Sequence, residues 1–431
     1  MQLKKSKTQP INIQAALALA TCSLLGTATA SEAENEWQFD TAVLVYSEVD
    51  RVSAVEVIVN GNKEYDDQHF LNLRFTIDSL TGASANGAVA QPNAQTFTRP
   101  SGNGQYTIEA DETPLDDTFK DTRVQLNAQW TQPLSPNITL SSGAHLSKEF
   151  DYLSLGVNSN IAVDFNRRNS TFSVGFSYFN DTLSPEGDIP VAFSSMLIGD
   201  SNSVTWDEEF ALTRAKGSDG KTTTDILLGF TQVISRRMIT QFNYSYSMID
   251  GYLTDPFKVL SVVNQHGITQ DLIYENRPGK RTKQSVYAQT KYHFDTGVLD
   301  LSYRYLWDNW QITSHTIDSK FRIDLGKGRF IEPHFRYYQQ QAAEFYRPFL
   351  TENDPVPAFA SSDYRIGEMT AITLGAKYAV PINNGNELGF RLEYYHQQPT
   401  NSGFDALGVL ADLELYQSVK AIFFQVSYSF Q

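Results

Sequence analysis

The sequence predicts an all-β fold, a transmembrane antiparallel β-barrel of the outer membrane with about 16 strands. Three observations predict it. Polar and apolar residues alternate along most of the chain, short and long connections alternate between these segments, and aromatic residues gather near both ends of the apolar faces. Strands of an outer-membrane barrel alternate a lipid-facing and a lumen-facing residue, and their periplasmic turns are short whereas their extracellular loops are long.

The amino terminus predicts a secretory signal peptide at residues 1–30. Three lysines precede the short apolar stretch 15–25, and the small residues Ala28 and Ala30 have the spacing found before a cleavage site. We therefore expect signal-peptide-directed export and a single barrel domain at 31–431. The expected location is the outer membrane of a Gram-negative bacterium.

Composition excludes several classes of protein. Aromatic residues make up 13% of the chain, which disordered proteins do not reach. The mature part contains no apolar run of the roughly 20 residues that a membrane-spanning helix needs. The formal net charge of −15 disfavours nucleic acid as a partner, because its phosphates would be repelled.

The only cysteine is Cys22, inside the signal peptide. It is either a lipoprotein acceptor or an ordinary signal-peptide residue, and the bulk of Thr21 before it favours the second interpretation. The mature chain therefore has no disulfide and no thiolate metal site.

Alternation with a period of two predicts each strand. In the clearest case, 123–131, Val124, Leu126, Ala128 and Trp130 alternate with polar residues. The predicted strands, in order, are 38–49, 52–60, 69–78, 123–131, 138–147, 153–165, 171–179, 225–234, 238–248, 285–294, 298–308, 312–325, 329–340, 370–380, 387–395 and 419–430. An even number returns both chain ends to one side of the membrane.

Two strands have special features. Pro333 lies inside a predicted strand, and we expect a bulge there because proline interrupts ladder hydrogen bonds. In the last strand Phe424, Val426, Tyr428 and Phe430 alternate, as in strands that the barrel-assembly machinery recognises. We therefore expect this machinery, outer-membrane lipid and lipopolysaccharide as partners.

The connections fall into two classes. Short polar turns are predicted at 166–169, 235–237, 295–297, 326–328 and 381–385, and long segments at 79–122, 181–222, 249–283, 341–365 and 398–415. Loops of the second length are uncommon in a compact soluble domain.

Aromatic residues on the apolar faces form two bands. Those near the short turns are Trp130, Phe165, Phe294, Tyr378 and Phe430, and those toward the outer ends are Tyr178, Tyr246, Trp307, Tyr337 and Tyr394. Aromatic residues are common in all β-strands, so a soluble β-sandwich is the alternative. Two bands favour a membrane barrel, whose interfaces carry aromatic girdles.

Several segments resemble an uncharacterised bacterial outer-membrane family, catalogued as domain of unknown function 3570. They are DSLTGASANGAV (78–89), TFTRPSG (96–102), the charged segment 114–123, SKEFDYLSLG (147–156), YLTDPFKV (252–259), YENRPGKR (274–281) and EPHFRYYQQ (332–340). The resemblance covers nearly the whole mature chain. It implies an outer-membrane β-barrel and no known catalytic or ligand residues.

The first long loop holds a run of carboxylates: Asp111, Glu112, Asp116, Asp117 and Asp121. Carboxylate oxygens are ligands of Ca²⁺, but the spacing is not that of an EF-hand, so a solvated acidic loop is the alternative. The same two interpretations apply to 207–209. Acidic loops at the mouth would favour cations.

Ionisable residues also lie on the polar faces of the later strands: Asp300, Arg304, Lys320, Arg322, Glu332, Arg336, Arg391 and Glu393. They form either a charged constriction that selects solutes or cross-strand ion pairs that stiffen the wall.

The leading function is a porin-like pore for small hydrophilic solutes. The alternative is a non-conducting barrel whose long acidic loops bind an extracellular ligand, metal or partner protein. The sequence contains neither HExxH nor GxSxG, and we expect no enzymatic activity and no cofactor apart from Ca²⁺ in the loops.

Overall fold

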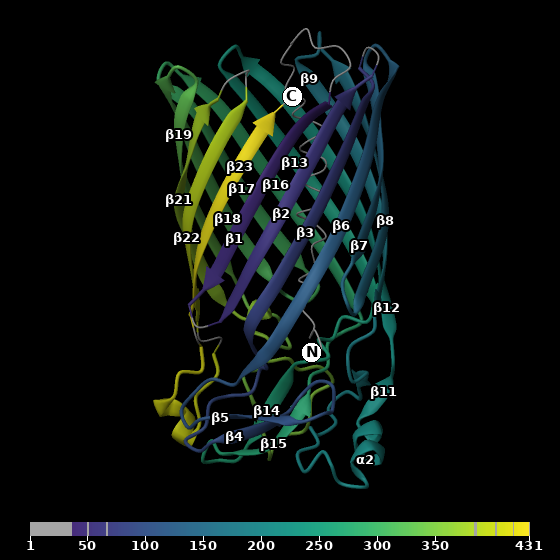
Figure 1. Cartoon of the computed structure of the whole chain (residues 1–431), viewed down its shortest axis with the longest axis vertical. Coiled ribbons are helices and arrows are strands. Elements are labelled where there is room, and N and C mark those ends of the chain that lie inside the picture. Colours follow the sequence, from purple (N-terminus) through teal and green to yellow (C-terminus); the bar gives the residue numbers. More distant parts are fainter. Residues whose placement is uncertain are drawn as a thin grey trace.

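The computed structural model describes residues 37–49, 51–65, 68–382, 386–400, 403–416 and 418–430. The predicted signal peptide, with Cys22, lies outside these residues. Sixteen strands form one closed antiparallel barrel (Figure 1). They are β1 (Trp37–Glu48), β2 (Val52–Glu64), β3 (Phe70–Ala85), β6 (Leu115–Ser135), β7 (Ile138–Lys148), β8 (Tyr152–Phe165), β9 (Ser170–Leu183), β12 (Asp219–Ser235), β13 (Met238–Gly251), β16 (Lys280–Phe294), β17 (Gly297–Asp308), β18 (Thr313–Gly326), β19 (Arg329–Gln340), β21 (Met369–Pro381), β22 (Glu387–Pro399) and β23 (Val419–Phe430).

The first and last strands close the sheet. β1 pairs with β23 from Phe39 opposite Phe430 to Glu48 opposite Ala421. Because every strand has two neighbours, the barrel has no free edge with unpaired backbone groups. The predicted fold class and the number of strands are confirmed.

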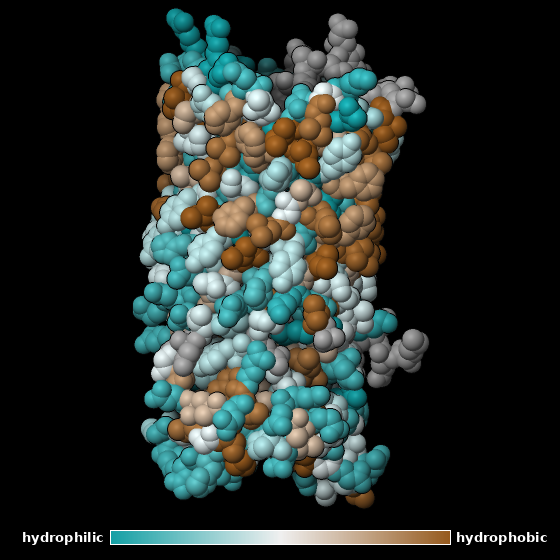
Figure 2. Space-filling view, turned by 90° about the vertical axis from the view of Figure 1, so that its left-hand side faces the viewer, coloured by the Kyte–Doolittle hydropathy of each residue, from teal (hydrophilic) through white to brown (hydrophobic). Residues whose placement is uncertain are grey.

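The outer face of the barrel is apolar. In β8, Leu155, Val157 and Ile161 are 50%, 56% and 45% exposed, whereas Ser154 and Asn160 on the other face are buried. Figure 2 shows that apolar residues gather on the half of the barrel nearer the short turns, and that the half nearer the long loops is more polar. An exposed apolar band around a closed barrel is the surface that faces lipid.

Several strands extend further toward the long loops than alternation predicts. β3 continues to Ala85 and β6 begins at Leu115, where the predicted boundaries were residues 78 and 123. In this part of β6 polar residues occupy both faces, for example Lys120 and Asp121. The ladder therefore continues beyond the apolar band, and alternation loses its signal where the wall leaves the membrane.

The bulge predicted at Pro333 is wrong. Lys320 pairs with His334 and Ile323 pairs with Ile331 in one register, and the only shift between β18 and β19 lies at their turn. Pro333 stays in register with Ala376 of β21. The missing N–H of proline therefore leaves a gap in the ladder to β18 and inserts no residue.

The long loops fold into a body that we call the cap, at the bottom of Figure 1: residues 86–114, 184–218, 252–279, 341–368, 400 and 403–416. Its elements are β4 (Gln95–Thr98), β5 (Gln105–Ile108), β10 (Ile189–Pro190), α2 (Trp206–Leu212), β11 (Arg214–Lys216), β14 (Val259–Val263), β15 (Thr269–Tyr274), β20 (Leu350–Thr351), η1 (Tyr364–Ile366) and η3 (Gly408–Asp412). None of the helices in the described part of the chain is long and apolar enough to cross a membrane.

Most of the buried apolar clusters lie in the cap. Phe97 of β4 packs with Val259 of β14 and Tyr274 of β15, and Val263 packs with Phe349 and with Leu410 of η3. These clusters bring together loops that are distant in the sequence. Long loops with their own packed cores form a folded cover and not a set of independent chains.

The cap crosses the mouth of the barrel. The Val259 N–H donates to the carbonyl of Asn86, which joins loop 252–279 to loop 86–114. Six barrel strands, β6, β7, β8, β9, β12 and β13, separate the points where these two loops leave the wall. β14 also pairs with β20 of loop 341–368, so loops from well-separated parts of the rim meet over the lumen.

Candidate functional site in the lumen and the cap

A histidine on the inner wall joins three strands. His334 of β19 lies with Nδ1 2.9 Å from Glu393 Oε1 of β22 and with Nε2 3.1 Å from Asp318 Oδ2 of β18. These positions alternate with the exposed residues Ile317 and Phe335, so the three side chains face the lumen. Carboxylates accept hydrogen bonds, and a ring that donates from both nitrogens is positively charged.

Further charges surround this histidine. Arg336 Nη1 is 3.9 Å from Asp318 Oδ2, Arg391 Nη1 is 3.3 Å from Glu393 Oε1, and Arg391 Nη2 is 4.0 Å from Glu332 Oε1. We call the six side chains the wall cluster: Asp318, Glu332, His334, Arg336, Arg391 and Glu393. The structure thus brings together four of the predicted lumen residues, which lie on β19 and β22, two strands separated by β21.

The other predicted lumen residues lie apart from the wall cluster or at its edge. Asp300 contacts Lys291 Nζ at 3.5 Å and accepts from Gln289 Nε2 at 2.6 Å. The guanidinium of Arg322 lies 3.7 Å from the centre of the Phe330 ring. Lys320 pairs across strands with both Asp300 and His334.

His334 and Asp318 are functional candidates that sequence reasoning missed. His334 has the same strand face as Glu332 and Arg336, and Asp318 has the same face as Lys320. Alternation alone could therefore have placed both in the lumen. The histidines are scattered along the chain, and their contacts form between strands. No sequence motif therefore indicated these contacts.

The opposite part of the wall is more acidic. Arg123 of β6 pairs with Asp78 of β3 at 2.6 Å and with Glu56 of β2 at 3.7 Å. On the next strands, Asp181 of β9 accepts from the Tyr152 hydroxyl at 2.5 Å. Carboxylates thus lie on β2, β3 and β9 in this part of the wall.

The five predicted metal ligands do not converge. Asp111 and Glu112 are exposed, Asp116 accepts a hydrogen bond from the Thr118 N–H at 3.0 Å, and Asp117 contacts Arg99 at 3.7 Å. Asp121 is buried on β6. In the part of the chain that the structure describes, no group of three or more His, Cys, Asp or Glu side chains has a geometry that could hold a metal ion.

The residues of the two predicted aromatic bands take different positions along their strands. Phe165, Phe294 and Phe430 are at or next to the short-turn ends of their strands, whereas Tyr178 and Tyr394 lie near the middle of β9 and β22. The remaining members of the short-turn band are Trp130 and Tyr378, and those of the outer band are Tyr246, Trp307 and Tyr337.

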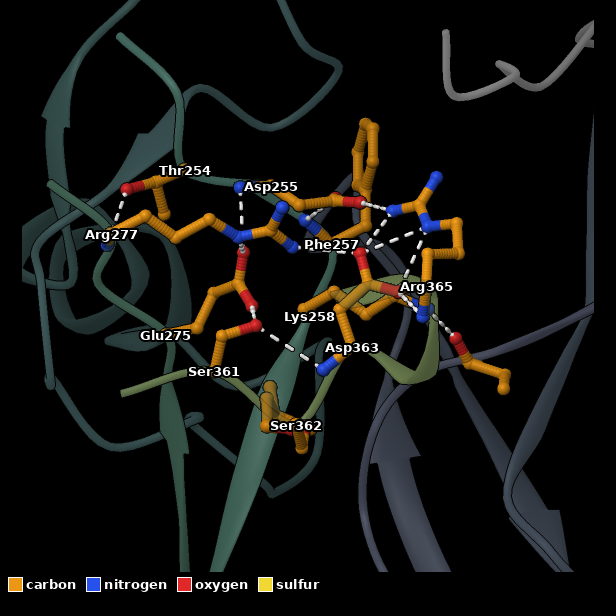
Figure 3. A network of polar contacts seen from close by, with 12 residues as sticks. Thr254, Asp255, Phe257, Lys258, Glu275, Arg277, Ser361, Ser362, Asp363 and Arg365 are labelled. Carbon is orange, nitrogen blue, oxygen red and sulfur yellow. Dashed lines mark hydrogen bonds and ion pairs between the residues drawn. The ribbon is translucent and has the colours of Figure 1, made fainter. Parts of the chain in front are cut away.

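The cap contains a buried network of charges (Figure 3). Asp363 lies between Arg277 and Arg365, whose Nη2 atoms are 2.8 Å and 2.5 Å from its Oδ2. Arg277 also contacts Glu275 Oε1 at 2.7 Å, and Arg365 contacts Asp255 Oδ2 at 2.7 Å. The network joins loop 252–279 to loop 341–368.

A lysine and a serine complete this network. Lys258 is buried and its ammonium donates to the carbonyl of Ala85, at the cap end of β3. The Ser361 hydroxyl donates to Glu275 Oε2 at 2.5 Å. The three acidic and three basic side chains have no net formal charge, which lowers the cost of burying them.

The electrostatics of the network favour the ionised form of Asp363. Burial alone would raise the pKa of Asp363, but Arg365, Arg277 and Lys258 hold that pKa well below its usual range. Burial raises the pKa of Glu275, and the opposing effect of Arg277 is smaller. Asp363 is therefore the ionised carboxylate that pairs with both Arg277 and Arg365.

Residues 14–430 match the model of a family described as "Protein of unknown function (DUF3570)". The chain belongs to this family. The resemblance inferred from the sequence segments is therefore confirmed. Of the charged cap residues, Asp255 and Lys258 lie in the segment YLTDPFKV, and Glu275 and Arg277 lie in YENRPGKR.

The barrel is also similar to solved structures. The siderophore receptor PirA from Acinetobacter baumannii is 9% identical with a TM-score of 0.41, and the match covers 90% of this chain but 58% of that receptor. A bacterial polysaccharide outer membrane secretin is 10% identical, with a TM-score of 0.43 and coverage of 93% and 100%. The toluene transporter TodX from Pseudomonas putida is 11% identical, with a TM-score of 0.37 and coverage of 94% and 92%. No curated protein matches the chain.

Proposed function

We propose that this DUF3570 protein is an outer-membrane channel for small hydrophilic solutes, with the cap controlling access from outside. The observation that carries the proposal is the charged inner wall of a closed barrel of 16 strands. Barrels of 16 to 18 strands are wide enough to leave an aqueous channel. Ionisable groups at membrane depth need water or one another, and the wall cluster has both if water fills the lumen.

The packing of the cap favours a channel with controlled access over a channel that is permanently open. Its loops share apolar cores and a buried charge network. A cavity of about 50 Å³ in the cap, bordered by Asn86, Tyr106 and Tyr274, has room for a few water molecules but not for a solute. We propose that part of the cap moves when a solute passes.

The expected location is the outer membrane, with the short turns in the periplasm and the cap outside. Export by the predicted signal peptide, lipopolysaccharide around the apolar band and insertion by the barrel-assembly machinery belong to the same proposal. Membrane fractionation and protease access to the cap on intact cells would test the location and the orientation.

Conductance is the direct test. Purified full-length protein in planar bilayers is expected to show stepwise current, with a higher open fraction when Asp363→Asn weakens the cap. Silence of both proteins at all voltages would reject the channel. That result would favour the alternative, a non-conducting barrel whose cap binds an extracellular ligand.

A further inference from the structure

Arg304 of β17 is a lumen-facing cation without an anionic partner. Its position alternates with the exposed residues Leu301 and Tyr303 on the lipid face of the strand and its side chain is half-buried. Among the described residues, no carboxylate lies within 4.0 Å of its guanidinium and no side chain or backbone group forms a hydrogen bond with it. Arg281 on the neighbouring strand, by contrast, pairs with Asp308 at 2.5 Å.

The residues opposite Arg304 carry hydroxyl groups. Strand pairing places Tyr287 of β16 and Thr316 of β18 directly across from Arg304, and Tyr338 of β19 lies across from Thr316. These four residues form one row on the inner face. A tyrosine or threonine hydroxyl can donate a hydrogen bond but adds no negative charge that could neutralise the arginine. The Tyr338 hydroxyl already donates to Gln340 Oε1 at 2.5 Å. The Tyr287 oxygen accepts a hydrogen bond from the Ser302 hydroxyl, so the Tyr287 O–H can still donate to an anion, as can that of Thr316.

A second arginine lies one step from this row. Arg336 pairs across strands with Asp318, next to Thr316, and it interacts electrostatically with Arg304. Its only ion pair among the described residues, with Asp318, is loose at 3.9 Å, and its side chain is 35% exposed. Two guanidinium groups of like charge thus face the lumen with little compensation, an arrangement that costs free energy unless an anion binds.

We propose that Arg304 and Arg336, together with the hydroxyls of Tyr287 and Thr316, form an anion-binding site on the lumen wall. The site takes the carboxylate or phosphate group of a small solute, because the planar fork of arginine matches the oxygens of either group. This inference rests on the proposed channel for its role in transport, and it specifies the solute class. According to this inference the lumen wall binds anions, whereas the acidic loops alone would favour the passage of cations.

The site can be tested by binding, independently of conduction. Isothermal titration calorimetry would follow inorganic phosphate and acetate binding to the full-length protein in detergent. We expect Arg304→Gln and Arg336→Gln each to weaken binding by about tenfold, the effect of losing a charge-assisted hydrogen bond. Arg304→Lys is expected to restore part of the affinity, because the ammonium keeps the charge and loses the fork.

Arg322→Gln is the matched control. It removes the same charge from the lumen wall at a position where the guanidinium stacks on Phe330, and it is expected to bind phosphate like the unaltered protein. Equal losses in Arg304→Gln and Arg322→Gln, or no binding of either anion by the unaltered protein, would overturn the site. Heat-dependent migration on gels would show that each variant is a folded barrel.

Reversal potentials separate the site from the channel. If the protein conducts, Arg304→Gln is expected to lower the ratio of anion to cation permeability more than Arg322→Gln does. Phosphate binding without current would reject the channel and leave the site standing. Current without phosphate binding would reject the site and leave the channel standing.

Discussion

Arg277 and Asp363 are 86 residues apart in the sequence, yet Arg277 Nη2 lies 2.8 Å from Asp363 Oδ2 in the cap. Their side chains are 9% and 1% exposed. The pair joins two loops that leave the barrel at different points of its rim. Removal of one partner from a buried ion pair costs more than the pair itself contributes, because the other charge stays buried without compensation. Movement of these loops apart must therefore break this contact.

The substitution Asp363→Asn is expected to weaken the cap and leave the barrel intact. It removes the anion shared by Arg277 and Arg365, and the free energy of cap opening should fall by about 3 to 5 kcal/mol. Hydrogen exchange should become faster in loops 252–279 and 341–368, with no change in the barrel strands. Asp354→Asn, an exposed carboxylate in the same loop, serves as the control. Unchanged exchange in Asp363→Asn would show that the network does not hold the cap.

Gly267 is expected to be essential for docking the segment 403–416 on loop 252–279. Its φ is +78°, and a Cβ there would lie 2.1 Å from the carbonyl oxygen of Leu407. Gly267→Ala should therefore release this segment, which limited proteolysis would detect as new cleavage. Gly403→Ala has a similar backbone conformation, φ +86°, but no atom within 4 Å of the added Cβ. If both variants resist protease equally, the close approach is not what positions the segment.

The turn between β7 and β8 is expected to lose stability as pH rises. Burial raises the pKa of Glu149 to about 9, and the carboxylate of Asp121 adds to the rise. The folded turn then holds a proton that the opened turn releases above its ordinary pKa of 4.5. The free energy of local opening should fall between these two pH values, by at most about 1.4 kcal/mol per pH unit.

Glu149→Gln should remove most of this pH dependence, because the amide stays neutral throughout. Hydrogen exchange of the turn at about pH 6 and about pH 8.5, corrected for the intrinsic rate, would measure it. Glu112→Gln, at an exposed carboxylate of the cap, should behave like the unaltered protein. Parallel pH profiles for the unaltered protein and Glu149→Gln would assign the effect to another group.

His334→Gln is expected to make the lumen more selective for cations. The histidine contacts Asp318 and Glu393, and glutamine cannot supply a positive charge to either carboxylate. Reversal potentials in a salt gradient should shift toward cation permeation. His266→Gln, at an exposed histidine of the cap, should leave the selectivity unchanged. Unchanged selectivity in His334→Gln would show that the neutral ring predominates in the lumen.

Alternation was sufficient to predict the barrel because it is a local property of each strand. The 16 segments read from polar and apolar residues are the 16 strands of the closed sheet, and the long connections lie at one end of it. The same pattern placed Arg336 and Glu393 on the inner face. Alternation of polar and apolar residues ends at the edge of the apolar band. It therefore could not predict that β3 and β6 continue further toward the cap.

Alternation within one strand could not predict which side chains contact one another on different strands. His334 and Glu393 are 59 residues apart, and they meet because β19, β21 and β22 pair in one register. The cap depends on still longer separations: Arg365 and Asp255 are 110 residues apart. Strand faces follow from the order of residues along the chain, whereas these partners are set by the closure of the barrel and by loops that fold against one another across its mouth.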